Sequence, residues 1–220
     1  MRTTLASGTP VEVAHPTDGS VATRGLVVVP DIMGLRPLFD GHAQRLADDN
    51  GWAVAAVEPW PGREAMPLEE RLGAVATIDD RALLADLVAA ADLLEVEPVG
   101  VIGFCMGGMF TYKAAGTGRF HRAVGFYGML KVPDHWKADD TIEPLDAVAS
   151  EAACPTMAII GTADQWTPPD DVEAAERAGI TVVRYEGADH GFVHDDTRPA
   201  HRAADAGDAW RRATAFLKEE

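Results

Sequence analysis

Val99-Gly100-Val101-Ile102-Gly103-Phe104-Cys105-Met106-Gly107-Gly108 joins an apolar run to a turn of small residues and then to a helix-like segment. We interpret it as a strand, a sharp turn and a helix. Cys105 stands at the apex between Gly103 and Gly107, which is the G-x-S-x-G spacing of a nucleophile elbow with sulfur in place of oxygen. A β-carbon at either glycine would collide with the neighbouring strand or helix. The motif predicts a cysteine nucleophile, although a buried cysteine in a glycine-rich turn is the alternative interpretation.

Strand-like and helix-like segments alternate on both sides of this stretch. Apolar runs typical of buried strands lie at 25–30, 52–57, 121–128, 155–161 and 181–185, and an edge strand is expected at 11–14. Helical spacing is found at 38–49, in two parts over 68–95, up to 115 after the elbow, at 170–178 and at 203–217. Residues 129–150 are expected to form a long loop with a short helix. This order predicts an α/β fold with a mostly parallel sheet and helices on both faces.

The length and charge of the chain narrow the classes of function. With 220 residues and no linker-like stretch, we expect a single domain over 1–220. The 35 acidic and 19 basic residues give a net charge of −16, which argues against nucleic acid and anionic membranes as partners. The two cysteines form neither a disulfide framework nor a zinc-ligand set. Because no apolar segment is long enough for a signal sequence or a membrane span, we expect a cytoplasmic protein.

An acid and a base follow the cysteine in the order that the α/β-hydrolase plan requires, each on a loop after a later strand. Asp164 and His190 follow the last two predicted strands. A thiolate is the attacking form of cysteine, so His190 is the candidate base, and Asp164 is the candidate acid that orients its ring. Asp189 is a weaker candidate for the acid, because it would have to fold back sharply onto its neighbour.

Two backbone N–H groups are expected to bind the oxyanion of the reaction. One belongs to Met106, directly after the nucleophile, and the other to Ile32, in the loop after the strand at 25–30. Together with the three side chains, they predict an acyl-transfer site at the carboxyl ends of the strands.

Other kinds of site fit the sequence less well. The glycines around Cys105 do not follow the G-x-G-x-x-G pattern of a dinucleotide site. His190 and His194 have the spacing of zinc ligands, but the glutamate of H-E-x-x-H is absent and Gly191 is a poor helix residue. The main non-enzymatic alternative is a ligand-binding or scaffold protein that retains the fold without turnover.

Four ordered segments resemble the dienelactone hydrolase family: Pro30-Asp31-Ile32-Met33-Gly34-Leu35, Gly103-Phe104-Cys105-Met106-Gly107-Gly108, the Gly-Thr-Ala-Asp164 loop and Asp189-His190-Gly191-Phe192. The resemblance covers nearly the whole chain. It implies an α/β-hydrolase fold without a lid domain, a Cys-His-Asp triad, no cofactor or metal, and a monomer. The implied activity is hydrolysis of a carboxylic ester or lactone, dienelactone-like, through a thioacyl enzyme. A general small-ester carboxylesterase is the alternative within the same class.

The resemblance also implies roles for residues around the cysteine. Asp31 stands where the family has a glutamate that activates the thiol, and it is one methylene shorter, so a loop or capping role is the alternative. The family holds the substrate carboxylate with arginines, and His194 occupies one of those places in this chain. Arg63 and Arg71 compete for the other place. Tyr127 and Trp166 fall where the family has pocket aromatics, although both are equally compatible with packing.

Overall fold

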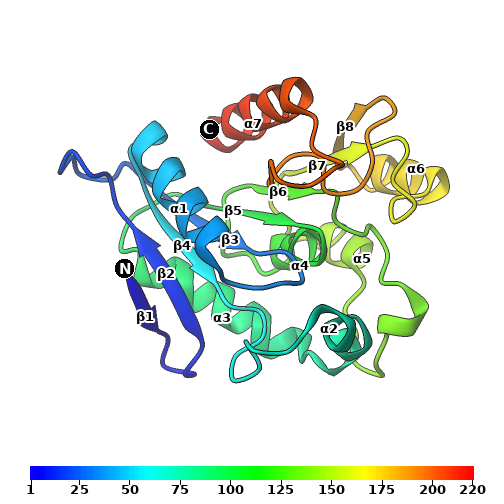
Figure 1. Ribbon diagram of the computed structural model, residues 1–220, viewed down its shortest axis with the longest axis horizontal. Helices are drawn as coiled ribbons and strands as arrows, with labels where there is room; N and C mark the ends of the chain where they lie inside the picture. Colours follow the sequence, from blue (N-terminus) through cyan, green and yellow to red (C-terminus); the bar gives the residue numbers. More distant parts are fainter.

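The computed structural model describes residues 1–220, which build one eight-stranded sheet with the order β1-β2-β4-β3-β5-β6-β7-β8 (Figure 1). β1 pairs with β2 and β2 with β4 in antiparallel fashion, and every other neighbouring pair is parallel. The mostly parallel sheet predicted from the sequence is therefore confirmed.

The strands are β1 (Arg2–Thr4), β2 (Pro10–Ala14), β3 (Arg24–Val29), β4 (Trp52–Val57), β5 (Val99–Phe104), β6 (Ala123–Phe126), β7 (Thr156–Gly161) and β8 (Thr181–Tyr185). The α-helices are α1 (Pro37–Asn50), α2 (Leu68–Ala74), α3 (Asp80–Leu93), α4 (Met106–Ala115), α5 (Pro144–Val148), α6 (Pro169–Arg177) and α7 (Ala203–Lys218). Two short 3-10 turns, η1 (Val75–Thr77) and η2 (Asp134–Trp136), complete the chain.

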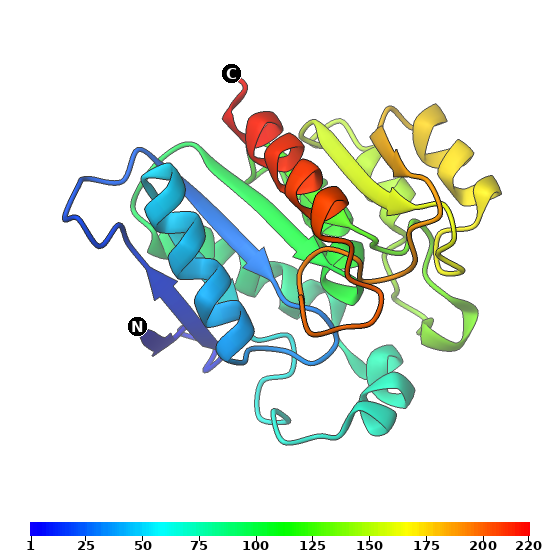
Figure 2. The ribbon, with the colours of Figure 1, turned by 45° about the horizontal axis from the view of Figure 1, so that its top comes forward.

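Helices cover both faces of the sheet, as the run of buried residues in each central strand requires. Alternate residues of β3 pack to opposite sides: Val27 and Val29 join the core under α3 and α4, whereas Leu26 and Val28 join the core under α1 and α7. Figure 2 shows α1 and α7 side by side across one face, with α3 and α4 behind the sheet. Both faces of the central strands are therefore shielded from water.

The parallel strands place their carboxyl ends at one edge of the sheet, where α/β proteins bind ligands. The loops after β3, β5, β7 and β8 all emerge at that edge. They carry Ile32, Cys105, Asp164 and His190, respectively. Residues separated by more than 150 positions in the sequence thus meet through the topology alone.

Most predicted elements agree with the structure. The segment from 129 to 150 is a long connection that contains only η2 and α5, as expected. The short edge strand β1 was not predicted, because its three residues are exposed and show no apolar alternation.

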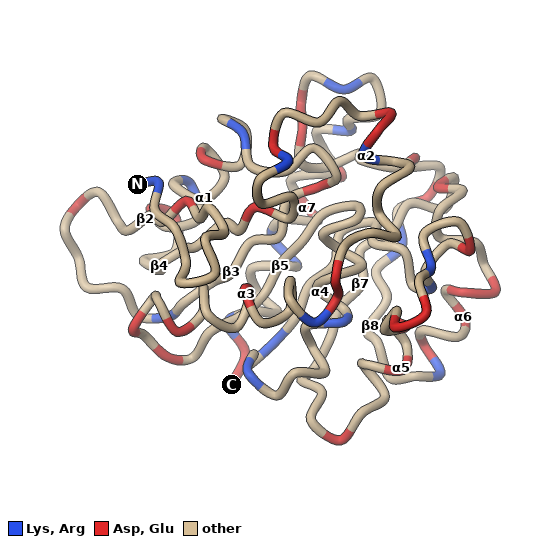
Figure 3. Tube along the Cα trace, turned by 90° about the horizontal axis from the view of Figure 1, so that it is seen from below, with Lys and Arg blue, Asp and Glu red and all other residues tan.

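The acidic excess is spread over the molecule. Figure 3 shows Asp and Glu interspersed with Lys and Arg along the whole trace, so the net charge of −16 is not confined to one element. None of the helices combines the length and the apolar character needed to cross a lipid bilayer.

Candidate active site

Cys105 occupies the strained turn between β5 and α4. Its backbone has φ +56° and ψ −123°, a conformation that residues other than glycine rarely adopt. A β-carbon at Gly103 would lie 2.3 Å from the carbonyl oxygen of Gly107, and one at Gly107 would lie 2.2 Å from that of Pro30. Only glycine at these two positions lets the helix approach β5 and the loop after β3 this closely. The partly exposed Cys105 is consequently held at the apex.

His190 and Asp164 are joined by a hydrogen bond from Nδ1 to Oδ2 of 2.8 Å. The Asp164 side chain is fully buried and that of His190 is 15% exposed. Burial lowers the pKa of His190, but Asp164 and the neighbouring Cys105 outweigh it and raise the pKa to about 10. Asp189 is exposed and accepts a hydrogen bond from the backbone N–H of His190, so it does not reach the ring nitrogen.

The loops that carry these two side chains are packed backbone against backbone. A β-carbon at Gly161 would lie 2.1 Å from the carbonyl oxygen of Ala188. The N–H of Ala163 donates to that same oxygen at 3.0 Å. The second carboxylate oxygen of Asp164 accepts from the N–H of Trp166 at 2.9 Å, which fixes the plane of the carboxylate. The relative position of acid and base is thus set by backbone contacts.

The loop that follows β3 is held from below by buried donors. The carbonyl of Ile32 accepts from Nε1 of Trp60 at 2.8 Å and from Nη1 of Arg71 at 3.2 Å. The N–H of Ile32 donates to no group of the protein, and that of Met106 opens α4 without an intrahelical acceptor. Both N–H groups are therefore available for an oxyanion.

Arg71 is not placed to bind a substrate carboxylate, contrary to one expectation from the family. It is 2% exposed, and its guanidinium also donates to the carbonyls of Met66 and Glu64. Arg63 likewise has other partners, because it donates to the hydroxyl of Thr77 at 2.8 Å and lies over the ring of Trp60, and it does not line the pocket that contains Cys105. The two candidate arginines thus have structural partners.

Asp31 lies in the pocket, but its carboxylate is engaged by other groups than the thiol. Arg36 donates to both oxygens, at 2.7 and 2.8 Å, and the N–H of Met33 donates to Oδ1 at 2.9 Å. His194 contacts Oδ2 at 2.8 Å. Burial raises the pKa of Asp31, but the hydrogen bonds from His194 and Arg36 outweigh burial and hold the pKa well below its usual value.

His194 and Tyr127 are buried, so neither lines the pocket as the family resemblance implied. The Tyr127 hydroxyl bonds to Nδ1 of His194. Because the ionised Asp31 can only accept, Nε2 of His194 carries the hydrogen and Nδ1 accepts from Tyr127. Burial lowers the pKa of His194, in keeping with this neutral form. The rings of Tyr127 and His190 also meet edge to face, with centroids 5.2 Å apart and planes at 64°.

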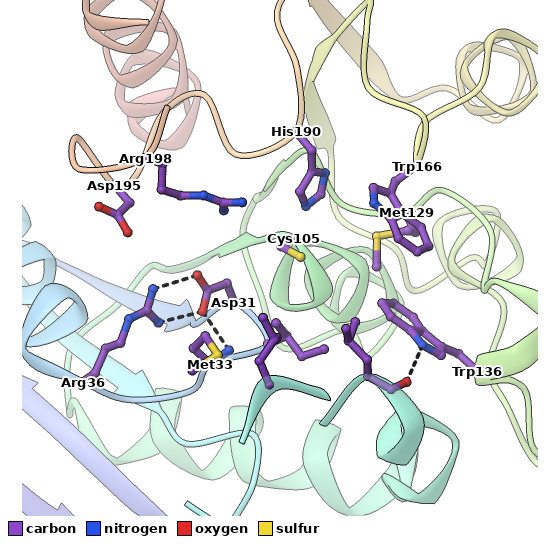
Figure 4. A pocket seen from close by; sticks show the side chains of 13 residues that line it. Asp31, Met33, Arg36, Cys105, Met129, Trp136, Trp166, His190, Asp195 and Arg198 are labelled. Carbon is purple, nitrogen blue, oxygen red and sulfur yellow. Dashed lines mark hydrogen bonds and ion pairs between the residues drawn. The ribbon is translucent and has the colours of Figure 1, made fainter. Parts of the chain in front are cut away.

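Cys105 and His190 open into one pocket of about 370 Å³, shown in Figure 4. The His190 ring points down towards the sulfur of Cys105 in this view. Arg36, Asp195 and Arg198 lie on one side of the cysteine, and Met129, Trp136 and Trp166 lie on the other. The remaining lining residues are Asp31, Ile32, Met33, Leu68 and Leu72. Of the expected pocket aromatics, Trp166 is present.

Arg198 is a pocket residue that the sequence reasoning missed. Its guanidinium lies above Gly191, where a β-carbon would come within 2.5 Å of Nη1. The Arg198 guanidinium has no hydrogen-bond or ion-pair partner in the protein. The guanidinium of Arg202, in contrast, bonds to the carbonyl of Glu186 and to the carboxylate of Asp205. No spacing rule links it to His190, eight positions earlier, because the loop folds back on itself. Arg198 lines the pocket, whereas His194, the candidate that the family resemblance gave for this region, is buried.

The sheet order, the elbow and the loop positions define an α/β-hydrolase fold with a hydrolase-type site. A sequence model of the dienelactone hydrolase family matches residues 11–220, and the chain belongs to this family.

Individual relatives agree with that assignment. The chain is 33% identical to a probable 2-oxo-3-(5-oxofuran-2-ylidene)propanoate lactonase of Bradyrhizobium sp over 88% of this chain and 82% of that protein. It is 29% identical to carboxymethylenebutenolidase 2 of Cupriavidus pinatubonensis, covering 89% and 86%. A crystal structure from Klebsiella pneumoniae, described as a dienelactone hydrolase, superposes with a TM-score of 0.86 at 25% identity and covers 100% and 98%. These similarities support a lactone or ester hydrolase of the dienelactone hydrolase type.

Proposed function

We propose that this protein hydrolyses a lactone or ester that carries a carboxylate, with Cys105 as nucleophile, His190 as proton carrier and Asp164 as the group that orients His190. The hydrogen bond between His190 and Asp164, beside a cysteine in an elbow turn, is the observation that carries the proposal. It is the arrangement in which a third group orients the base next to a nucleophile.

In the first half of the reaction, the thiolate of Cys105 attacks the carbonyl carbon. The negative charge that develops on the carbonyl oxygen is stabilised by the N–H groups of Ile32 and Met106. Because the pKa of His190 is raised to about 10, its imidazolium is available at neutral pH both to favour the thiolate and to act as the acid. The carbon–oxygen bond then breaks, and His190 donates its proton to the departing oxygen. In a lactone, this step opens the ring.

In the second half, water attacks the thioester and gives a proton to His190. The carbon–sulfur bond breaks, which restores the thiolate and releases the acid. Asp164 keeps Nδ1 occupied throughout, so that Nε2 is the nitrogen that exchanges the proton.

Arg198 supports an anionic substrate, since its guanidinium is the unpaired positive charge at the pocket wall next to His190. Arg36 faces the same pocket but is already bound bidentately to Asp31. The names of the two curated relatives above denote lactones that bear a carboxyl group, which favours the same substrate class.

The proposal is tested with an enol lactone carrying a carboxylate and with p-nitrophenyl acetate. We expect Cys105→Ala to abolish hydrolysis of both while its circular dichroism spectrum stays that of the wild type. Intact mass spectrometry after rapid acid quench should show the wild-type chain, and not the variant, with an added acyl group. Turnover retained by Cys105→Ala would reject the nucleophile, and binding without turnover in the wild type would favour a non-catalytic protein.

A further inference from the structure

One wall of the pocket is apolar and lies opposite the arginines. It consists of Leu68, Leu72, Met129, Trp136 and Trp166, here called the apolar wall. In Figure 4, Cys105 lies between Met129, Trp136 and Trp166 of this wall and the Arg36 and Arg198 side of the pocket. A substrate whose carbonyl sits at the sulfur therefore has a charged surface on one side and an apolar surface on the other.

Leu68 and Leu72 of the apolar wall are exposed to solvent, as is Met33 elsewhere in the same pocket. Six large hydrophobic residues of the chain are exposed, and three of them, Met33, Leu68 and Leu72, line this pocket. The fractional exposures of Leu68 and Leu72 are 44% and 38%. Exposed apolar groups gathered at one concave place mark a binding surface, because scattered ones would not share a pocket.

The tryptophans give this wall a flat shape. The rings of Trp136 and Trp166 are stacked, with centroids 5.6 Å apart and an angle of 15° between their planes. Trp136 is buried and its Nε1 donates to the carbonyl of Leu72 at 3.0 Å, so α2 and the ring are fixed to each other. Trp166 is partly exposed and is held by its N–H on Asp164. The Trp136 ring and the backbone of Trp166 are therefore held in place by hydrogen bonds within the protein.

We propose that the apolar wall is a subsite for a flat, apolar group of the substrate, of the size of one or two fused rings, on the side of the scissile carbonyl away from Arg198. Stacked and edge-to-face contacts with the tryptophans would orient such a group, and the leucines would cover it. This inference rests on the proposed hydrolysis at Cys105 and adds a substrate class to it, namely aromatic esters or lactones larger than a single small lactone ring.

The test compares three esters by titration of the released acid. They are ethyl acetate, ethyl 2-naphthylacetate with the rings on the acyl side, and 2-naphthylmethyl acetate with the rings on the alcohol side. We expect kcat/KM for at least one naphthyl ester to exceed that for ethyl acetate about 10-fold, since hydrophobic pocket contacts discriminate by roughly this amount. The difference should lie mainly in KM.

Leu68→Ser and Leu72→Ser combined should lower that preference, the ratio of kcat/KM for the naphthyl ester to that for ethyl acetate, about 10-fold. Leu93→Ser is the matched control, because Leu93 is 44% exposed and does not line the pocket. These leucines are half exposed, so their replacement leaves the fold in place.

The outcomes separate the two proposals. Hydrolysis of all three esters by Cys105 without a naphthyl preference, or a preference equally affected by Leu93→Ser, overturns the subsite and leaves the proposed function intact. Absence of hydrolysis overturns the proposed function. The subsite is then decided by calorimetric titration of 2-naphthylacetate into Cys105→Ala, which must bind more tightly than the same protein with Leu68→Ser and Leu72→Ser added.

Discussion

Nε2 of His194 lies 2.8 Å from Oδ2 of Asp31, in the interior between the loop after β3 and the loop that carries His190. Tyr127 bonds to the opposite nitrogen of His194, and Arg36 holds the other side of Asp31. In this series of hydrogen bonds, the donor or acceptor role of each group is fixed by the bond before it. These buried hydrogen bonds thus join the loop after β3, which carries Asp31, to the loop after β8, which carries His190 and His194.

His194→Leu should therefore lower the free energy of unfolding by about 2–4 kcal/mol, because Asp31 loses a donor and Tyr127 loses an acceptor in the interior. His194→Gln should recover at least half of this loss, since an amide can donate to Asp31 and accept from Tyr127. Urea unfolding monitored by tryptophan fluorescence measures both. Equal stability of the leucine variant and the wild type would show that the hydrogen bonds of His194 contribute nothing to the free energy of unfolding.

Stability should decline in mild acid because of His42, which lies beneath the same network. Its Nε2 donates to the carbonyl of His194 at 2.6 Å. Burial lowers the pKa of His42 to about 4 from its ordinary value of 6.5. A depressed pKa means that the folded state prefers the neutral ring, so this stabilisation is complete above pH 6.5 and is lost as pH falls towards 4.

The loss amounts to about 2–3 kcal/mol at pH 4. His42→Gln should flatten the dependence of Tm on pH between 6.5 and 4, while the decline below pH 4 that follows from protonation of Asp31 remains. Thermal unfolding at half-unit pH steps measures the difference. If Tm of the variant fell with pH as steeply as Tm of the wild type, the acid sensitivity would belong to groups other than His42.

Arg198→Gln should separate charged from neutral substrates. We expect kcat/KM for a carboxylate-bearing lactone to fall about 10- to 100-fold, because a charge-assisted hydrogen bond is lost, and that for p-nitrophenyl acetate to stay within about 2-fold. Arg81→Gln is the control, since Arg81 is exposed and does not line the pocket. An equal loss for both substrates would mean that Arg198 has no role in recognising the carboxylate.

Asp164→Asn should move the alkaline limb of the pH–rate profile. Asp164 raises the pKa of His190, so its replacement should lower that pKa from about 10 and shift the loss of the imidazolium to lower pH. The raised pKa of His190 also makes the stability of the fold depend on pH. The stabilisation by the protonated ring is complete below pH 6.5 and is lost as pH rises towards 10.

Profiles of kcat/KM from pH 5 to 11 for wild type and variant measure the shift. We expect kcat to fall at least about 100-fold, because the imidazole loses the partner that fixes its orientation. An unchanged alkaline limb would indicate that the limb belongs to another group.

The sequence allowed the sheet, the elbow and the positions of Cys105, Asp164 and His190 to be predicted, because each depends on local pattern and strand order. The partners of polar side chains could not be predicted in the same way. The sequence alone does not distinguish Arg71 from Arg63. In the structure, Arg71 is buried among backbone carbonyls, whereas Arg63 lies over the ring of Trp60. The partners of these side chains depend on how the loops pack, and hydrophobic periodicity in the sequence carries no information about loop packing.

Position 194 illustrates the same limit. The family pattern places a substrate-binding side chain there, whereas the structure buries His194 and leaves the free charge at Arg198. The exchange depends on Gly191, whose φ of +78° and missing β-carbon make room for the guanidinium. Only a three-dimensional view connects these three residues.

Gly107→Ala should disrupt the elbow itself. The added β-carbon would lie 2.2 and 2.3 Å from the carbonyl oxygens of Pro30 and Val29, and backbone at both sites cannot give way without moving β3 or α4. We expect the free energy of unfolding to fall by about 3 kcal/mol and esterase activity to be lost. Gly73→Ala is the matched control, because Gly73 lies in α2 with open space around it, so alanine there should raise stability by about 0.5–1 kcal/mol. Thermal unfolding and p-nitrophenyl acetate hydrolysis of both variants decide the point, and a Gly107→Ala protein as stable and active as the wild type would contradict the close approach of α4 to β3 on which the position of Cys105 depends.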